Sequence, residues 1–271
     1  MIEITDNEFR LLSSYIKEHS GINIVEAKKT LLVGRLSNMI TELGFEDFMS
    51  YYKYLKSSNN SKELIKLMDK ITTNHTYFLR ESEHFNYFNQ TVLPYLKDTV
   101  KSKDLRIWCA ASSSGEEPYT LAILLADFFK AEEHLWDKKI LATDISLNVL
   151  EEAKNGVYSE EKVNSLPKIW LLNYFNKVGT DKFQVKDFLK RQVIFRQFNL
   201  TEAVFPFKKK MHVIFCRNVM IYFDNQTKDE LVEKLYNSLE YGGYLFIGHS
   251  ESINREKTKF KFIKPAVYRK I

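Results

Sequence analysis

Residues 105–123, LRIWCAASSSGEEPYTLAI, run from an apolar segment through a loop of small residues into a helical segment that has Pro118 in its first turn. The same alternation continues along the chain, and we expect strands at 105–110, 139–144, 192–199, 211–216 and, after a Gly-Gly turn, 244–249. Apolar runs separated by helices predict a parallel sheet covered on both faces. The sequence therefore indicates a doubly wound α/β domain of the nucleotide-binding type.

The chain before this domain has helical periodicity instead. Thr5 and Glu8 form a capping-box pattern, and Gly21 ends the helix that follows. Further helical patterns occupy 32–43, 48–55 and 64–71, with a polar break at 57–61. We expect an all-α domain over residues 1–73, then a linker segment and connecting helix over 74–98, with the helix ending near Pro94. The α/β domain covers 99–271 and includes a small antiparallel β insert at 157–191.

Composition excludes several classes of protein. The 271 residues are 44% hydrophobic with only nine glycines and five prolines, so disordered, collagen-like and low-complexity chains are excluded. No run approaches the roughly 18 apolar residues that a membrane span needs, and we expect a cytoplasmic protein without membrane insertion. Cys109 and Cys216 lack metal-ligand spacing, so we expect neither a metal site nor a disulfide.

The net charge of +5 is unevenly distributed. Residues 1–73 contain ten basic and ten acidic residues, whereas residues 251–271 contain seven basic and two acidic ones. A basic tail can contact phosphates, but it can also be the solvated face of a strand. We favour the second interpretation and expect no nucleic-acid partner.

Polar residues follow several of the predicted strands, where ligands bind in doubly wound sheets. Glu116 and Glu117 occupy a helix start that a phosphate would otherwise use, which predicts a cationic ligand unless they only complement the helix dipole. Asp144 stands where an acidic residue holds a ribose, or it caps the next helix. Arg217 leaves a buried strand and needs a partner, which could be a purely structural Arg–Asp pair.

A nucleoside joined to a cation indicates S-adenosylmethionine. Its adenine and ribose would lie toward Asn199 and Asp144, and its ammonium toward Glu117. NAD fits less well, because the loop after the first strand lacks G-x-G-x-x-G.

These segments resemble the chemotaxis receptor glutamate O-methyltransferase family (CheR). The matching segments are ITTNHTYFLRE (71–81), IWCAASSSGEEPYTLAI (107–123), LATDIS (141–146), CRNVMIYFD (216–224) and GHSES (248–252). The resemblance implies a helical domain followed by a Rossmann-like S-adenosylmethionine-dependent methyltransferase domain. It implies catalytic roles facing the methyl group and the substrate for Arg80 and Tyr222. It also implies cofactor contacts at Asn74, Thr76, Arg80, Glu117, Asp144, Asn199, Leu200, Arg217 and Asn218.

By this resemblance the reaction methylates glutamates of methyl-accepting chemotaxis receptors for adaptation, giving glutamyl methyl esters and S-adenosylhomocysteine. Two features depart from the family. The string of arginines with which enteric relatives dock on receptors is reduced to Arg35, and the insert at 176–191 is short, so we expect no pentapeptide tether. The alternatives are another acceptor, either RNA or a small molecule, and a non-catalytic cofactor-binding module in a chemosensory complex.

Overall fold

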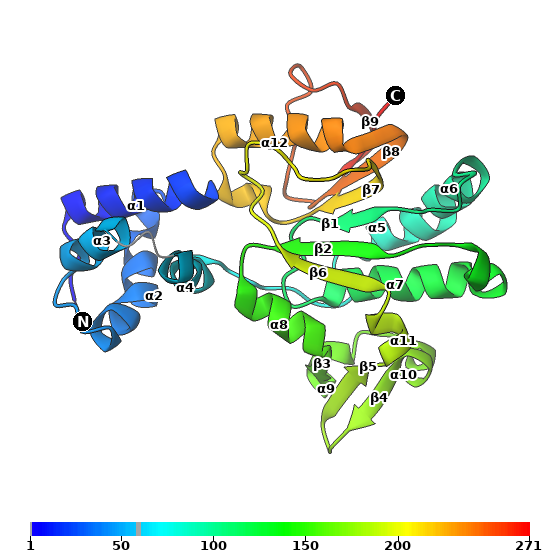
Figure 1. The fold of residues 1–271 in the computed structure, drawn as a ribbon, viewed down its shortest axis with the longest axis horizontal. Helices are drawn as coiled ribbons and strands as arrows, with labels where there is room; N and C mark the ends of the chain where they lie inside the picture. The colour runs from blue at the N-terminus through cyan, green and yellow to red at the C-terminus, as the bar shows by residue number, and fades with distance from the viewer. Residues whose placement is uncertain (1, 58–60) are drawn as a thin grey trace.

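The computed structural model describes residues 2–57 and 61–271, and its first four helices form a separate layer (Figure 1). The predicted capping box is confirmed: the Thr5 hydroxyl accepts from the Glu8 amide, and the Glu8 carboxylate accepts from the Thr5 amide at 2.8 Å. Part of the predicted polar break, residues 58–60, lies outside the described residues. The helices of this layer are α1 (Asp6–Ser20), α2 (Lys29–Glu42), α3 (Phe48–Ser57) and α4 (Ser61–Ile71).

A seven-stranded sheet forms the centre of the second domain. Its order is β6-β2-β1-β7-β8-β10-β9, and the first five of these strands are mutually parallel. All five predicted strands are present, and two antiparallel strands from the basic tail extend the sheet. The strands are β1 (Ile107–Cys109), β2 (Ile140–Asp144), β6 (Val193–Gln197), β7 (Met211–Cys216), β8 (Leu239–Ile247), β9 (Lys261–Lys264) and β10 (Val267–Arg269).

The predicted turn at Gly242–Gly243 was wrong. These residues lie inside β8, where the register against β7 shifts between Met211 and Val213. Gly242 has φ +83°, and an irregular strand position of this kind needs the conformational freedom of glycine. The strand begins at Leu239, which pairs with Met211, and regular pairing with β7 resumes at Tyr244 opposite Val213.

Both faces of the sheet are covered, as predicted. Ile107 and Cys109 face one core, which includes α7 (Glu116–Phe128) and α8 (Leu147–Asn155), while Trp108 faces the other, which includes α12 (Asn225–Ser238). Figure 1 also shows that the carboxyl ends of the parallel strands lie at the end of the sheet nearest the helical layer.

The connecting helix differs from the expectation that it ends near Pro94. It runs as α5 (Ser82–Tyr87), a π-helical segment η2 (Phe88–Val92) and α6 (Leu93–Thr99). Pro94 lies in the first turn of α6, directly after the wide π-helical turn. Proline lacks an amide hydrogen and collides with the preceding turn of a regular helix, and a change in the helix type at this point lets the helix continue.

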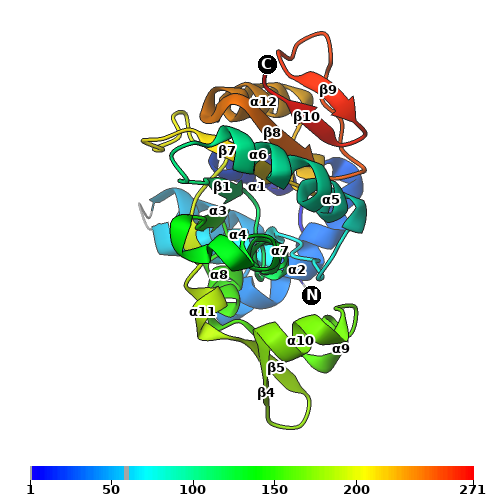
Figure 2. The same cartoon turned by 90° about the vertical axis from the view of Figure 1, so that its right-hand side faces the viewer.

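The insert projects from the sheet below α8 (Figure 2). It is a three-stranded antiparallel sheet of order β3-β5-β4, which confirms the predicted fold of residues 157–191. Its elements are β3 (Val157–Ser159), α9 (Glu160–Val163), α10 (Lys168–Tyr174), β4 (Phe175–Val178), β5 (Lys182–Val185) and α11 (Asp187–Lys190).

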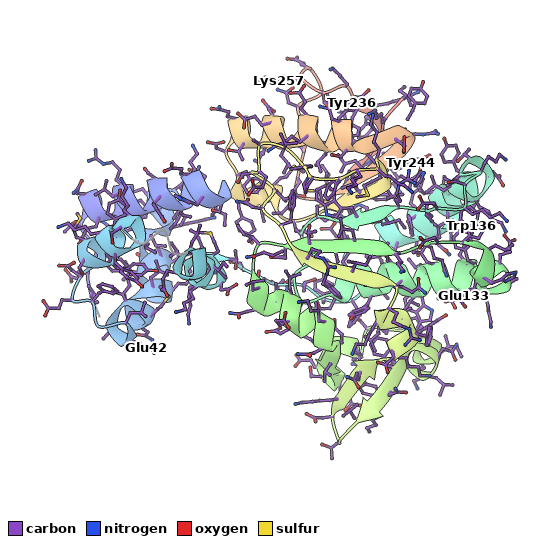
Figure 3. The ribbon with its side chains drawn as sticks, viewed as in Figure 1. Glu42, Glu133, Trp136, Tyr236, Tyr244 and Lys257 are labelled. Atoms are coloured by element: carbon purple, nitrogen blue, oxygen red, sulfur yellow. The ribbon has the colours of Figure 1, made fainter. Side chains whose placement is uncertain are left out.

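The basic tail is fastened to α12 before it enters the sheet (Figure 3). Lys257 pairs with Asp229 at 2.7 Å, and the rings of Tyr236 and Phe260 lie 5.1 Å apart. The tail is therefore part of the fold. Across residues 2–57 and 61–271, none of the helices combines the length and apolarity required to span a membrane.

Candidate active site

One cavity lies where the helical layer meets the carboxyl ends of β1, β2, β6 and β7. It encloses about 1010 Å³ of empty space, including its open mouth. All the residues that the sequence predicts for the site line it: Asn74, Thr76, Arg80, Glu117, Asp144, Asn199, Leu200, Arg217, Asn218 and Tyr222. They come from the ends of three strands, β2, β6 and β7, from the start of α7 and from the segment that joins the two domains.

Asp144 is buried at the end of β2 and is fixed by backbone donors. Its Oδ2 accepts from the Ser113 amide at 2.9 Å and its Oδ1 from the Ser146 amide at 3.0 Å. Burial raises the pKa of this carboxyl, and the backbone hydrogen bonds oppose that rise. The residue that caps α8 is Ser146, not Asp144. An ionised carboxylate has about four acceptor sites, so Asp144 can still accept from a ligand hydroxyl.

The two glutamates that begin α7 have different surroundings. Glu116 is fully buried, accepts from Ser114 Oγ at 2.7 Å and pairs with Lys162 at 2.9 Å, so it is a structural residue outside the cavity. Glu117 lines the cavity, and its carboxylate lies 2.6 Å from Arg217 Nη1. Burial raises the pKa of Glu117, and the Arg217 charge opposes that rise.

Arg217 is paired, as its burial requires, but with glutamates rather than with an aspartate. Besides Glu117, its guanidinium contacts Glu81 at 3.0 Å and donates to the Arg80 carbonyl. The alternative of an Arg–Asp pair is therefore wrong, because the partners of Arg217 are glutamates. An adjacent carboxylate and guanidinium are complementary to the ammonium and carboxylate of an α-amino acid. Since the Asp144 carboxylate, an acceptor for hydroxyl groups, lines the same cavity, the residues fit S-adenosylmethionine.

Arg80 and Tyr222 both line the cavity. Arg80 Nη1 donates to the His75 carbonyl at 2.7 Å, and its guanidinium lies 5.9 Å from the Tyr77 ring. Since a guanidinium has five N–H donors, others remain for a ligand. Tyr222 lies in the short helix η4 (Met220–Tyr222), and its carbonyl accepts from the Asn23 amide at 2.8 Å.

Asn199 has a contact that the sequence did not predict. Its side-chain amide donates to the His19 carbonyl at 2.7 Å, and its Oδ1 accepts from the Thr201 amide at 3.0 Å and from the Thr201 hydroxyl. Lys17 also pairs with Asp224 at 2.5 Å. The end of α1 is thereby bound to the second domain, and Ser20 and Ile22 form part of the cavity wall.

The segment between the domains is held where it leaves the helical layer. The Asn74 carbonyl accepts from Ser113 Oγ at 3.1 Å, which ties the segment to the loop after β1. Arg35 donates to Thr73 Oγ1 at 2.6 Å and to the Ile71 carbonyl. Arg35 therefore supports this segment.

Glu81 is a site-supporting residue that the sequence analysis missed. Its Oε1 accepts from Asn218 Nδ2 at 3.1 Å, and its Oε2 accepts from Arg217 and from the His249 amide. The only available signal was its place inside a matching segment. Backbone strain marks the same region, because four residues around the cavity have positive φ. They are Leu79, Glu81, Ser113 and Asn218.

Glu81, His84 and His249 each have one potential ligand atom within 4.8 Å of the others. However, the Glu81 carboxylate is already bound to Arg217 and Asn218, and the Arg217 charge opposes a cation. We therefore assign no metal to this group.

Two family models match the chain. The CheR methyltransferase all-alpha domain matches residues 7–72, and the CheR methyltransferase SAM binding domain matches residues 74–269. A chemotaxis protein methyltransferase of Borreliella burgdorferi is 45% identical over 99% of this chain and 96% of its own length. A probable chemotaxis protein methyltransferase of Rhizobium etli is 38% identical over 94% and 96%, and a chemotaxis protein methyltransferase of Escherichia coli is 34% identical over 98% and 92%.

Proposed function

The chain belongs to the CheR methyltransferase family, whose members use S-adenosylmethionine, and from this premise we propose that it methylates glutamate side chains of methyl-accepting chemotaxis receptors. The observation that carries the proposal is the cavity in which Arg80 and Tyr222 lie together with the Glu117–Arg217 pair and Asp144. Relatives named as chemotaxis protein methyltransferases match nearly the whole chain and support a methyltransferase that acts in chemotaxis.

The residues divide into groups that hold the donor and groups that face the acceptor. Glu117 and Arg217 bind the amino-acid end of the cofactor, and Asp144 binds its ribose. When bound, S-adenosylmethionine supplies a methyl group on a positively charged sulfur. The remaining proposed contacts to the cofactor come from Asn74, Thr76, Arg80, Asn199, Leu200 and Asn218.

A glutamate acceptor requires little acid–base chemistry. A glutamate carboxyl with a pKa of about 4.3 is ionised at neutral pH, so no strong general base is needed. Arg80 orients this carboxylate by charge-assisted hydrogen bonds, and Tyr222 completes the wall beside the methyl group. Alignment of the reacting groups can contribute roughly 7 to 11 kcal/mol.

Exclusion of water is the second contribution of this cavity. Ionic reactants are better solvated by water than a transition state in which their charges are dispersed, so a dry site favours the transfer. Ser20 and Ile22 from the helical domain close one side of the cavity, and Phe85 and Leu200 add apolar surface. We propose that the reaction takes place in the cytoplasm, on the signalling helices of the receptors and without a pentapeptide tether.

The proposal is tested by methyl transfer from radiolabelled S-adenosylmethionine to receptor-bearing membranes of the source organism. We expect label in the receptor band that is released as methanol by mild base, because a glutamyl methyl ester is base-labile. Membranes without receptors are the control. Base-stable label would contradict a glutamate acceptor, and absence of transfer from a protein that binds the cofactor would favour a non-catalytic module.

A further inference from the structure

The turn after β7, residues 217–222, supplies Arg217, Asn218 and Tyr222 to the cavity, and a carboxylate outside the cavity wall holds its backbone. Glu251 Oε2 accepts from the amides of Asn218 at 2.9 Å and Gly248 at 2.6 Å. Its Oε1 accepts from the amides of Met220 at 2.7 Å and Ile221 at 3.3 Å. One side chain therefore satisfies four backbone donors, three of which belong to this turn.

The turn needs such support because its backbone is strained. Asn218 has φ +58°, in the left-handed region that side chains other than glycine rarely adopt. Asn218 also packs closely against Gly248, because a Cβ built on Gly248 would lie 3.0 Å from the Asn218 backbone nitrogen. An observed outlier of this kind at a ligand cavity points to a position that is held for function.

The charge on Glu251 is used entirely for this purpose. Among the described residues no lysine, arginine or histidine pairs with it, and the four groups that donate to it are all backbone N–H groups. Burial raises the pKa of Glu251, and the backbone donors oppose the rise because they bind the ionised form. Hydrogen bonds to an ionised acceptor are about twice as strong as neutral ones.

We infer that Glu251 is a positioning residue, which sets the Arg217–Tyr222 turn and through it both cofactor affinity and methyl transfer. Glu81 holds the same turn from the opposite side through the side chains of Arg217 and Asn218. Glu251 binds the backbone of the turn, so it fixes the Cα positions from which these side chains extend. The part of this inference that concerns transfer rests on the proposed function, whereas the part that concerns cofactor affinity does not.

The test compares Glu251→Gln with Glu256→Gln, an exposed glutamate in the same segment, and with the conservative Glu251→Asp. Glutamine keeps the size of the side chain but turns one acceptor oxygen into a donor that faces backbone N–H groups. Titration calorimetry with S-adenosylhomocysteine should show affinity weakened about tenfold in Glu251→Gln, the cost of one charge-assisted hydrogen bond, with binding stoichiometry kept at about one per chain. Glu251→Asp should recover part of the affinity, and Glu256→Gln should match the wild type.

Methyl transfer provides the second measurement. Because Met220 and Ile221 lead into Tyr222, kcat of Glu251→Gln should fall by more than its KM for S-adenosylmethionine rises. A purely structural role gives the opposite pattern, with a lower stoichiometry and a lower melting temperature but unchanged affinity of the folded fraction.

That opposite pattern, or wild-type affinity and kcat in Glu251→Gln, would overturn the inference. If the wild-type protein binds S-adenosylhomocysteine but fails to label receptors, the proposed acceptor is wrong, and the calorimetry still decides the role of Glu251.

Discussion

Arg217 connects parts of the cavity that lie far apart in the linear sequence. It bonds to Glu117 and Glu81, which lie 100 and 136 positions away, and its guanidinium carbon lies 5.2 Å from the Phe85 ring. A buried guanidinium with two carboxylate partners leaves this group of three with one net negative charge. A positively charged ligand such as S-adenosylmethionine is favoured in such surroundings.

Arg80 and Tyr222 should affect turnover more than cofactor affinity. We expect Arg80→Ala to lower kcat about 100-fold through loss of acceptor alignment, and Tyr222→Phe to lower it about tenfold. Affinity for S-adenosylhomocysteine should change by less than about threefold, since the main cofactor charges are elsewhere. Radiolabel transfer and calorimetry measure the two effects. Exposed Arg191→Ala and Tyr241→Phe are the matched controls, and unchanged turnover in Arg80→Ala would remove its proposed role.

Asp144 should affect cofactor affinity. In Asp144→Asn the side-chain amide must face either the Ser113 or the Ser146 amide, so one buried donor loses its acceptor. We expect the dissociation constant for S-adenosylhomocysteine to rise at least about tenfold. Calorimetry beside the exposed control Asp98→Asn checks this, and equal affinity of the two variants would show that Asp144 does not hold the ribose.

The site residues at strand ends could be predicted, because the carboxyl ends of parallel strands meet at one edge. Asp144 and Arg217 are examples. Their partners could not be predicted in the same way. Glu81 and Glu251 meet the 217–222 turn only through the three-dimensional fold, and Asn199 donates to a carbonyl 180 positions earlier.

At the level of elements, the end of α1 carries a close contact between domains. Gly21 ends the helix with φ +73°, and a Cβ there would lie 2.5 Å from Thr201 Cγ2 and 3.3 Å from the Phe223 ring. The Asn23 amide then donates to the Tyr222 carbonyl. The helix terminus therefore supports the 217–222 turn directly.

Gly21→Ala should separate the effect of this contact from backbone strain. Gly44 also has positive φ, at +83°, but nothing lies within 4 Å of a Cβ built on it. Gly44→Ala should therefore cost only the left-handed strain, about 1–2 kcal/mol in the free energy of unfolding. Gly21→Ala adds a collision and should cost about 1–3 kcal/mol more. Urea denaturation compares the two, and equal losses would contradict a close contact between the domains.

Helices and strands were predictable to the extent that local pattern determines them. Thr5, Glu8 and Gly21 define α1 because capping acts within a few residues. Pro94 and Gly242–Gly243 misled the prediction, since their usual effect is overridden by a π-helical turn and by backbone hydrogen bonds to Lys270. Local propensity is a weak guide where long-range contacts supply the missing bonds.

At the scale of the whole molecule, stability should fall in acid because of buried histidines. His212 Nδ1 accepts from the Arg106 amide at 3.0 Å, which requires the neutral ring. Burial and the nearby Arg106 charge lower the pKa of His212 to about 4. The unfolded chain, with a pKa of about 6.5, binds more protons between these values, so stability is present above pH 6.5 and is lost toward pH 4.

His212→Asn tests this linkage, since its Oδ1 can accept the same hydrogen bond without titrating. Between pH 8 and pH 5 the wild type should lose on the order of 1–2 kcal/mol more unfolding free energy than the variant. Urea denaturation at both values measures the difference. His134→Asn, at an exposed histidine, should behave as the wild type, and equal pH slopes for wild type and His212→Asn would refute the assignment.

The basic tail supplies the edge strand of the large sheet, and this position gives its positive charge a role against self-association. Within the part of the chain that the structure describes, β9 is the terminal strand, so one row of its backbone groups has no strand beside it. Such edges can recruit another chain and extend into aggregates. Exposed Lys259 and Lys261 lie at the start of this short strand. The same lysines of a second copy that approached this edge would be repelled by them. The positive charge of the tail thus protects the open side of the sheet from polymerisation.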